Sequence, residues 1–154
     1  MSNQLTNEAE DRKVLGVDHG LQIQLLYGVP MSVRAKLKQR RITTCGQLLR
    51  AAAAAPRRAT LLAETGIDPA ILMVFIRRAD LARIDGIGVV FGRLLEDVGV
   101  HEIEELAKRE ANELHAALRD YNRQERLARR SPTLEEVADW IAKAQKLPIV
   151  ITGE

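Results

Sequence analysis

Three features are scarce in this sequence, and each scarcity excludes something. There is one cysteine, Cys45, so no disulfide can form within the chain and a reducing compartment is expected. Aromatic residues make up only 3% of the 154 residues, so a core must be built from Leu, Ile, Val and Ala. No apolar run approaches the roughly 18 residues of a membrane-spanning helix, and the polar residues 1–13 lack a signal-peptide pattern. We therefore expect a cytoplasmic protein with no membrane partner.

Charge is present in both signs but is unevenly distributed along the chain. The net charge is +2, yet residues 21–81 carry ten Lys or Arg against three acids, a net +7. Residues 1–20 carry a net −2 and residues 82–154 a net −3. A basic half of this kind attracts polyanions that the whole chain would not attract.

The fold class follows from periodicity, because apolar residues recur at helical spacing from Leu21 onward and convincing strand alternation is absent before the final extended tail. We predict an all-α protein in four parts: a disordered leader (1–20), two helical units (21–84 and 85–150) and a tail (151–154). Residues 21–28 are expected to form a helix with Ile23, Leu26 and Tyr27 on one face. The apolar run that begins at Pro69 predicts the central helix.

The two units look like copies of one another. Leu37, Ile42 and Leu48 match Leu95, Val100 and Leu106 at a spacing of 58 residues, which also separates Gly28 from Gly86. Arg41 against Gly99 is a mismatch, and Phe75–Ile76 matches Trp140–Ile141 after a short insertion. Units this small bury little surface alone, so the sequence predicts two repeats that share one core.

The second copy resembles the helix-hairpin-helix motif, in which an apolar residue, Gly, an apolar residue and Gly precede a helix that ends in Gly and an apolar residue. The positions that fill this pattern are Ile84, Gly86, Ile87, Gly88, Leu94, Leu95, Gly99 and Val100. The stretches "RRADLARIDGIG", "GVHEIEELAKR", "NELHAAL" and "LARRSPTLEEVADWIAKAQKLP" are similar to the bacterial family called domain of unknown function 4332. The resemblance covers roughly residues 37–150, and it implies tandem helix-hairpin-helix motifs and nucleic-acid binding that does not depend on base sequence.

The glycine turn carries the chemistry that this resemblance implies. Backbone N–H groups at the start of a helix point at a phosphate, and the helix dipole adds partial positive charge there. The sequence departs from this phosphate-binding pattern in both copies. In the second copy the acidic Asp85 precedes the turn, and Val89 and Val90 stand where a Lys, Ser or Thr would help. In the first copy Pro30 removes one N–H donor. Gly86 and Gly88 also fit a purely structural turn that needs positive φ.

Basic side chains could complete the phosphate grip. Arg34, Lys38 and Arg41 fall on one helical face, behind Ser32 as a candidate N-cap, although a solvated basic face explains them equally well. Arg57, Arg58, Arg77 and Arg78 could extend this face, unless Arg77 and Arg78 pair with Asp80 or Glu64. Arg129 and Arg130 form a second basic loop, which could instead anchor helix C-termini. The residues predicted to contact phosphate are Gly28, Ser32, Arg34, Lys38, Arg41, Gly86, Ile87, Gly88, Arg93, Arg129 and Arg130.

No residues in the sequence have the spacing of a nucleophile with a base, a metal cluster or a nucleotide loop, so we expect no enzyme, no cofactor and no metal. DNA or RNA is the first expected partner. A second copy or another protein is the alternative, because a basic and an acidic half can dock head to tail.

Overall fold

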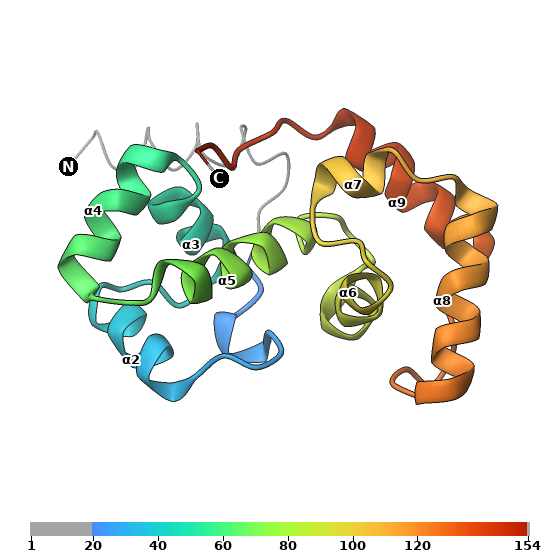
Figure 1. The fold of residues 1–154 in the computed structure, drawn as a ribbon, viewed down its shortest axis with the longest axis horizontal. Coiled ribbons are helices and arrows are strands. Elements are labelled where there is room, and N and C mark those ends of the chain that lie inside the picture. The colour runs from blue at the N-terminus through green and yellow to red at the C-terminus, as the bar shows by residue number, and fades with distance from the viewer. Residues whose placement is uncertain (1–19, 154) are drawn as a thin grey trace.

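The computed structural model describes residues 20–153, and between them it is all-α, as the sequence predicts. The predicted leader lies outside these residues except for Gly20. The helices are the 3₁₀ helix η1 (Ile23–Leu25) and the α-helices α2 (Met31–Gln39), α3 (Cys45–Ala52), α4 (Ala55–Thr65), α5 (Pro69–Leu81), α6 (Gly88–Asp97), α7 (Ile103–Ala107), α8 (Ala111–Glu125) and α9 (Leu134–Lys146) (Figure 1). None of the helices in this part of the chain has the length and apolar character that a bilayer crossing needs.

Side-chain caps explain where several of these helices begin. Thr44 forms a capping box with Gln47 at the start of α3, and Thr133 forms one with Glu136 at the start of α9. Asp68 accepts hydrogen bonds from the backbone N–H groups of the first turn of α5. Ser32 does not cap α2, because the N-cap position is Pro30 and Ser32 lies within the helix.

The predicted helix over residues 21–28 is wrong. Only the three residues of η1 are helical, because the neighbouring backbone pairs with the segment before α3 instead. The N–H of Ile23 donates to the carbonyl of Thr43 at 2.9 Å, and the N–H of Cys45 donates to the carbonyl of Leu21 at 2.7 Å. Tyr27 is consequently 51% exposed rather than turned inward with Ile23.

The buried apolar side chains form two clusters, whereas the sequence interpretation expected one shared core. The first cluster runs from Ile23 to Ala79 and the second from Leu81 to Ala144. The boundary falls at the C-terminal end of α5, a helix that crosses the middle of the molecule (Figure 1) and whose buried apolar side chains belong to the first cluster except for Leu81. α5 is therefore central, as the sequence predicts, but it joins two cores and is not the middle of one.

The helices of the two halves correspond in order and position. α2 and α3 match α6 and α7 at a spacing of 58 residues, while α5 and α9 match at 65. In each half the second helix packs on the fourth, α3 on α5 and α7 on α9. The mismatched pair Arg41 and Gly99 share a left-handed backbone, with φ of 62° and 96°. The chain therefore makes the same turn after α2 and after α6, although only the second turn has the glycine that favours it.

The tail after α9 packs against the first half of the chain, which the sequence did not predict (Figure 1). The N–H of Thr152 donates to the carbonyl of Ala53 at 3.0 Å, and its hydroxyl oxygen accepts from the N–H of Ala55 at 2.9 Å. The buried guanidinium of Arg58 donates to the carbonyls of Thr152 and Gly153. Val150 and Ile151 pack against the first cluster, so the tail ties the two halves together.

Candidate nucleic-acid interface

Several predicted site residues line a shallow, open groove of about 590 Å³. Residues 86–91, which are the glycine turn and the start of α6, line one side. Residues 127–130, in the loop between α8 and α9, line the other. The groove therefore brings together five predicted residues that lie up to 44 positions apart in the sequence: Gly86, Ile87, Gly88, Arg129 and Arg130.

The glycine turn has the backbone that its sequence predicts. Gly86 has φ of +93° and Gly88 has φ of +61°, which is the left-handed region that favours glycine. Between them Ile87 is only 2% exposed and anchors the turn in the second cluster. No side chain caps α6, and the first N–H groups of an α-helix have no acceptor within the helix itself. These donors at a helix N-terminus are available to an anion.

The opposite wall is a basic loop that is folded against the last turn of α8. The side-chain amide of Asn122 accepts from the N–H of Ala128 at 2.9 Å and donates to its carbonyl at 3.1 Å. Arg129 is exposed and has no acidic partner in the part of the chain that the structure describes. The side chain of Arg130 is 60% exposed and pairs with Glu136, and its Cζ atom lies 5.4 Å from the centre of the Phe91 ring.

The charges around this groove favour an anion more than the sequence suggested. The hydrogen bond from Arg130, followed by one from the N–H of Thr133, lowers the pKa of Glu136 to about 2, so this carboxylate is ionised at neutral pH and forms an ion pair with Arg130. Asp85 is not among the residues that line the groove. Its charge acts on Lys143 of α9, whose pKa is raised mainly by the hydrogen bond to Asp139 and also by Asp85. Asp85 therefore lies within electrostatic range of Lys143, although it directly precedes Gly86 in the chain.

The first glycine turn is engaged in the junction between the two halves. Gly28 has φ of +74°, and a Cβ there would lie 3.6 Å from Nη1 of Arg78. Arg78 donates to the carbonyl of Tyr27 and forms two hydrogen bonds with Glu96 of α6, both at 2.8 Å. Arg93, another predicted phosphate ligand, places its Cζ atom 4.0 Å from the centre of the Tyr27 ring. Gly28 and Arg93 therefore lie at this junction, and neither lines the groove at Gly86.

The basic face of α2 forms a separate surface. Arg34 and Lys38 line a second groove of about 200 Å³ with polar neighbours such as Gln22 and Thr43. Arg34, Lys38, Arg41 and Ser32 are all exposed, and the three cations have no acidic partner between residues 20 and 153. This face and α8 lie in opposite halves of the molecule along its longest axis (Figure 1).

Three of the four arginines that could extend this basic face are buried or paired with acids, whereas Arg57 is exposed. Arg58 is buried and holds the tail, and Arg57 donates to the carbonyl of Arg50 at 2.9 Å. Arg77 pairs with Glu102 at 3.0 Å, and Arg78 pairs with Glu96. Both acids belong to the second half of the chain, so these arginines connect the halves.

Sequence reasoning missed a buried ion pair that supports the glycine turn. Nε of Arg83 lies 2.7 Å from Oδ1 of Asp80, and the two side chains are 0% and 7% exposed. Nη2 of Arg83 also donates to the carbonyl of Pro148 at 2.8 Å. The pair lies at the end of α5, just before Gly86. Through Pro148 it joins this part of the chain to the segment that follows α9. The only sequence signal was the three-residue spacing of opposite charges.

Cys45 is a fully buried side chain in the first cluster, as expected of a small core residue. Burial raises the pKa of its thiol to about 12. Among residues 20–153 no group of three or more His, Cys, Asp or Glu side chains has the arrangement of a metal site.

Comparison with known families gives one match. The model of a family described as a domain of unknown function (DUF4332) matches residues 28–147, most of the chain. No curated protein and no solved structure matches the chain.

Proposed function

This chain belongs to the DUF4332 family, and we propose that it is a non-enzymatic module that binds the phosphate backbone of nucleic acid without reading the bases. The observation that supports this proposal is the groove in which the glycine turn at Gly86–Gly88 faces Arg129 and Arg130. The turn contributes N–H donors and the partial positive charge of a helix N-terminus. The loop contributes Arg129, an exposed cation of the kind that is absent from the start of α6, beside Arg130 in its pair with Glu136.

We interpret the two halves as tandem copies of one helix-hairpin-helix-like unit, in which the copies have different roles. The correspondence of their helices and the shared left-handed backbone at Arg41 and Gly99 support this interpretation. The second copy has a free glycine turn, whereas the first uses Gly28 at the junction with α6. We therefore assign phosphate binding to the second turn, with the α2 face as an additional basic surface. The single cysteine of the chain supports placing this activity in the cytoplasm.

Fluorescence anisotropy with a labelled DNA duplex, a single strand and an RNA hairpin across a salt series tests this proposal. We expect binding whose log affinity falls as log salt rises, with a slope of about −3 or steeper if several phosphates are neutralised. Arg129→Glu should weaken binding several-fold. Lys146→Glu, which makes the same change of charge at the C-terminal end of α9, is the matched control. Absence of binding at low salt, or equal losses in both variants, would overturn the proposal.

Self-association is a second candidate function, because one segment exposes three large apolar side chains. Leu25, Tyr27 and Met31 are 54%, 51% and 81% exposed within seven residues. Adjacent exposed apolar groups are typical of protein contacts. Sedimentation velocity across a concentration series should detect a dimer that Met31→Asp disrupts. A monomer at every concentration would exclude this candidate.

A further inference from the structure

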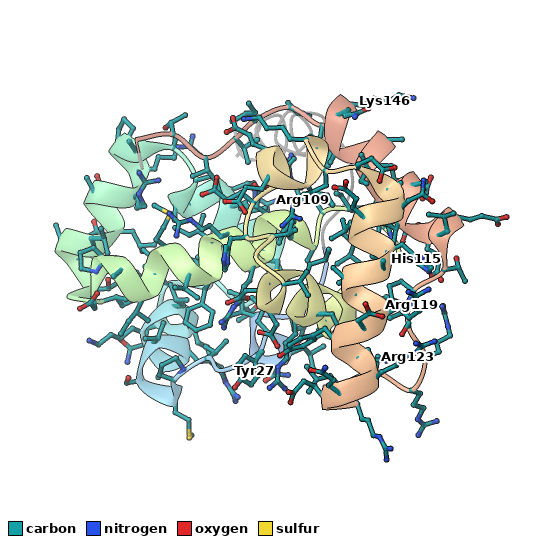
Figure 2. The ribbon with its side chains drawn as sticks, turned by 45° about the vertical axis from the view of Figure 1, so that its right-hand side comes forward. Tyr27, Arg109, His115, Arg119, Arg123 and Lys146 are labelled. Carbon is teal, nitrogen blue, oxygen red and sulfur yellow. The ribbon has the colours of Figure 1, made fainter. Side chains whose placement is uncertain are left out.

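A basic stripe runs along α8 beside the groove. His115, Arg119 and Arg123 follow one another at four-residue spacing, about 6 Å of helix rise per step, and Figure 2 shows them in order along the helix. Arg126 continues the stripe at the end of α8. At 3.6 residues per turn, Glu113 and Glu125 lie about a third of a turn from Arg119, whereas Asp120 lies about a sixth of a turn from Arg123.

Few of these cations are neutralised. Arg123 and Arg126 are exposed and have no acidic partner in the described part of the chain. Arg119 has one contact with an acid, its Nε atom lying 3.4 Å from Oδ1 of Asp120, and the two side chains are 42% and 63% exposed. An exposed pair of this kind contributes little, so Arg119 can exchange Asp120 for an anionic ligand at small cost.

The stripe is continuous with the groove. The two hydrogen bonds between Asn122 and Ala128 hold the basic loop against the last turn of α8. Arg123 and Arg126 therefore lie next to the segment that carries Arg129 and Arg130. Together the loop and the helix provide a row of cations whose complement is an extended, regularly spaced polyanion.

The surroundings of the row favour phosphate contacts over base stacking. Phe91 in the groove lies beneath the guanidinium of Arg130, and Trp140 is buried. Tyr121 on α8 is half-buried, and its hydroxyl group donates to Asp97 at 2.8 Å. Tyr27, the most exposed aromatic side chain between residues 20 and 153, lies at the junction with Arg93 near its ring. Proteins that bind single strands use exposed aromatic platforms, and this surface offers none.

We propose that the ligand is a double-stranded nucleic acid, one strand of which passes from the groove at Gly86–Gly88 and Arg129 onto α8, where Arg123 and Arg119 contact successive phosphates. This inference rests on the proposed function. It adds the class of nucleic acid and the path that one strand follows over the surface. The row reads only the backbone, so the duplex is bound without sequence preference.

Fluorescence anisotropy of labelled nucleic acid, titrated with the full chain, tests the inference. A labelled 20-base-pair duplex should bind at least five-fold more tightly than either of its strands at the same salt concentration. The double variant Arg119→Glu/Arg123→Glu should lose about ten-fold in duplex affinity, with a salt slope shallower by about 2. The matched control is Lys108→Glu/Lys146→Glu, which makes the same charge change on exposed residues at the ends of α7 and α9 and should change affinity less than two-fold. Fluorescence of Trp140 checks that each variant is folded.

The possible outcomes separate the two proposals. If the wild-type chain binds no nucleic acid, both the proposed function and this inference fail. If Arg129→Glu weakens binding while the α8 double variant binds like its control, phosphate binding in the groove is supported and the proposed path along α8 is wrong. If single strands bind as tightly as the duplex, the substrate class is wrong.

Discussion

The buried pair Asp80–Arg83 gives the sharpest prediction about stability. Arg83→Met removes the guanidinium whose Nε lies 2.7 Å from Oδ1 of Asp80, a side chain only 7% exposed. Breaking a buried ion pair by removing one partner costs about 3–5 kcal/mol. The carbonyl of Pro148 loses its donor as well, which adds about 1 kcal/mol. Since a domain of this kind is stable by about 5–15 kcal/mol, the variant should lose a large share of its free energy of unfolding.

Urea unfolding measures this loss, followed by the fluorescence of Trp140, the only tryptophan of the chain and a member of the second cluster. The double variant Asp80→Leu/Arg83→Met should be more stable than either single variant, because it replaces both members of the buried pair with apolar groups. Asp139→Ala is the control, since it breaks the exposed pair with Lys143 at the same end of the molecule and should have a much smaller effect.

Two results would refute the reasoning. A loss below about 1 kcal/mol in Arg83→Met would mean that solvent reaches the pair and screens it. A double variant whose loss equals the combined losses of the two single variants would mean that Asp80 and Arg83 do not interact. If the reasoning holds, the single variant should also weaken duplex binding, because Arg83 holds the segment just before Gly86.

Three further predictions concern single side chains. The thiol of Cys45, with a pKa of about 12, should react with Ellman's reagent at pH 8 only as fast as the protein unfolds, and rapid labelling without denaturant would contradict its burial. The folded-state pKa of Glu136 is depressed, so its contribution to stability is present above pH about 4.5 and is lost as the pH falls towards 2. The stability difference between wild type and Glu136→Gln should shrink over that range, and a constant difference would exclude the bond to Arg130 as its source. Arg41→Gly should raise the free energy of unfolding by about 0.5–1 kcal/mol, because Arg41 has φ of 62° where Gly99 occurs in the second half; a lower urea midpoint would disprove this.

Most of the fold was predictable because its signals are local. The capping boxes at Thr44 and Thr133 and the Asp68–Pro69 pair mark helix starts through contacts within four residues. The exception was residues 21–28, whose apolar spacing suits a helix. Their backbone pairs instead with Thr43 and Cys45, about 20 residues away, and no periodicity within the segment carries that information.

The candidate site was predictable in its parts but not in its assembly. The spacing of Gly86 and Gly88 predicted the turn, and the charge run predicted the basic loop with Arg129 and Arg130. Their joint position in one groove depends on how α8 packs beside α6 and on the bonds between Asn122 and Ala128.

The fate of each arginine illustrates the same limit. From the sequence, Arg34 was expected on a basic face that Arg58 and Arg78 could extend, with pairing to an acid as the alternative for Arg78. Arg34 is exposed, Arg58 is buried against the tail and Arg78 is paired with Glu96. A guanidinium has the same sequence signature in all three settings, because its partner is chosen by which carboxylate or carbonyl the fold brings within reach.

By itself, the sequence determined the helical class, most helix ends and the backbone of the glycine turns, since these depend on interactions among neighbouring residues. Only the tertiary structure decided that the buried side chains divide into two clusters, that the tail returns to the first half, and that the arginine loop faces the second glycine turn. Those features depend on contacts between residues tens of positions apart. The free energy that stabilises these contacts comes from burial of apolar surface and from hydrogen-bond and ion-pair partners. Those partners cannot be identified from neighbouring residues in the sequence.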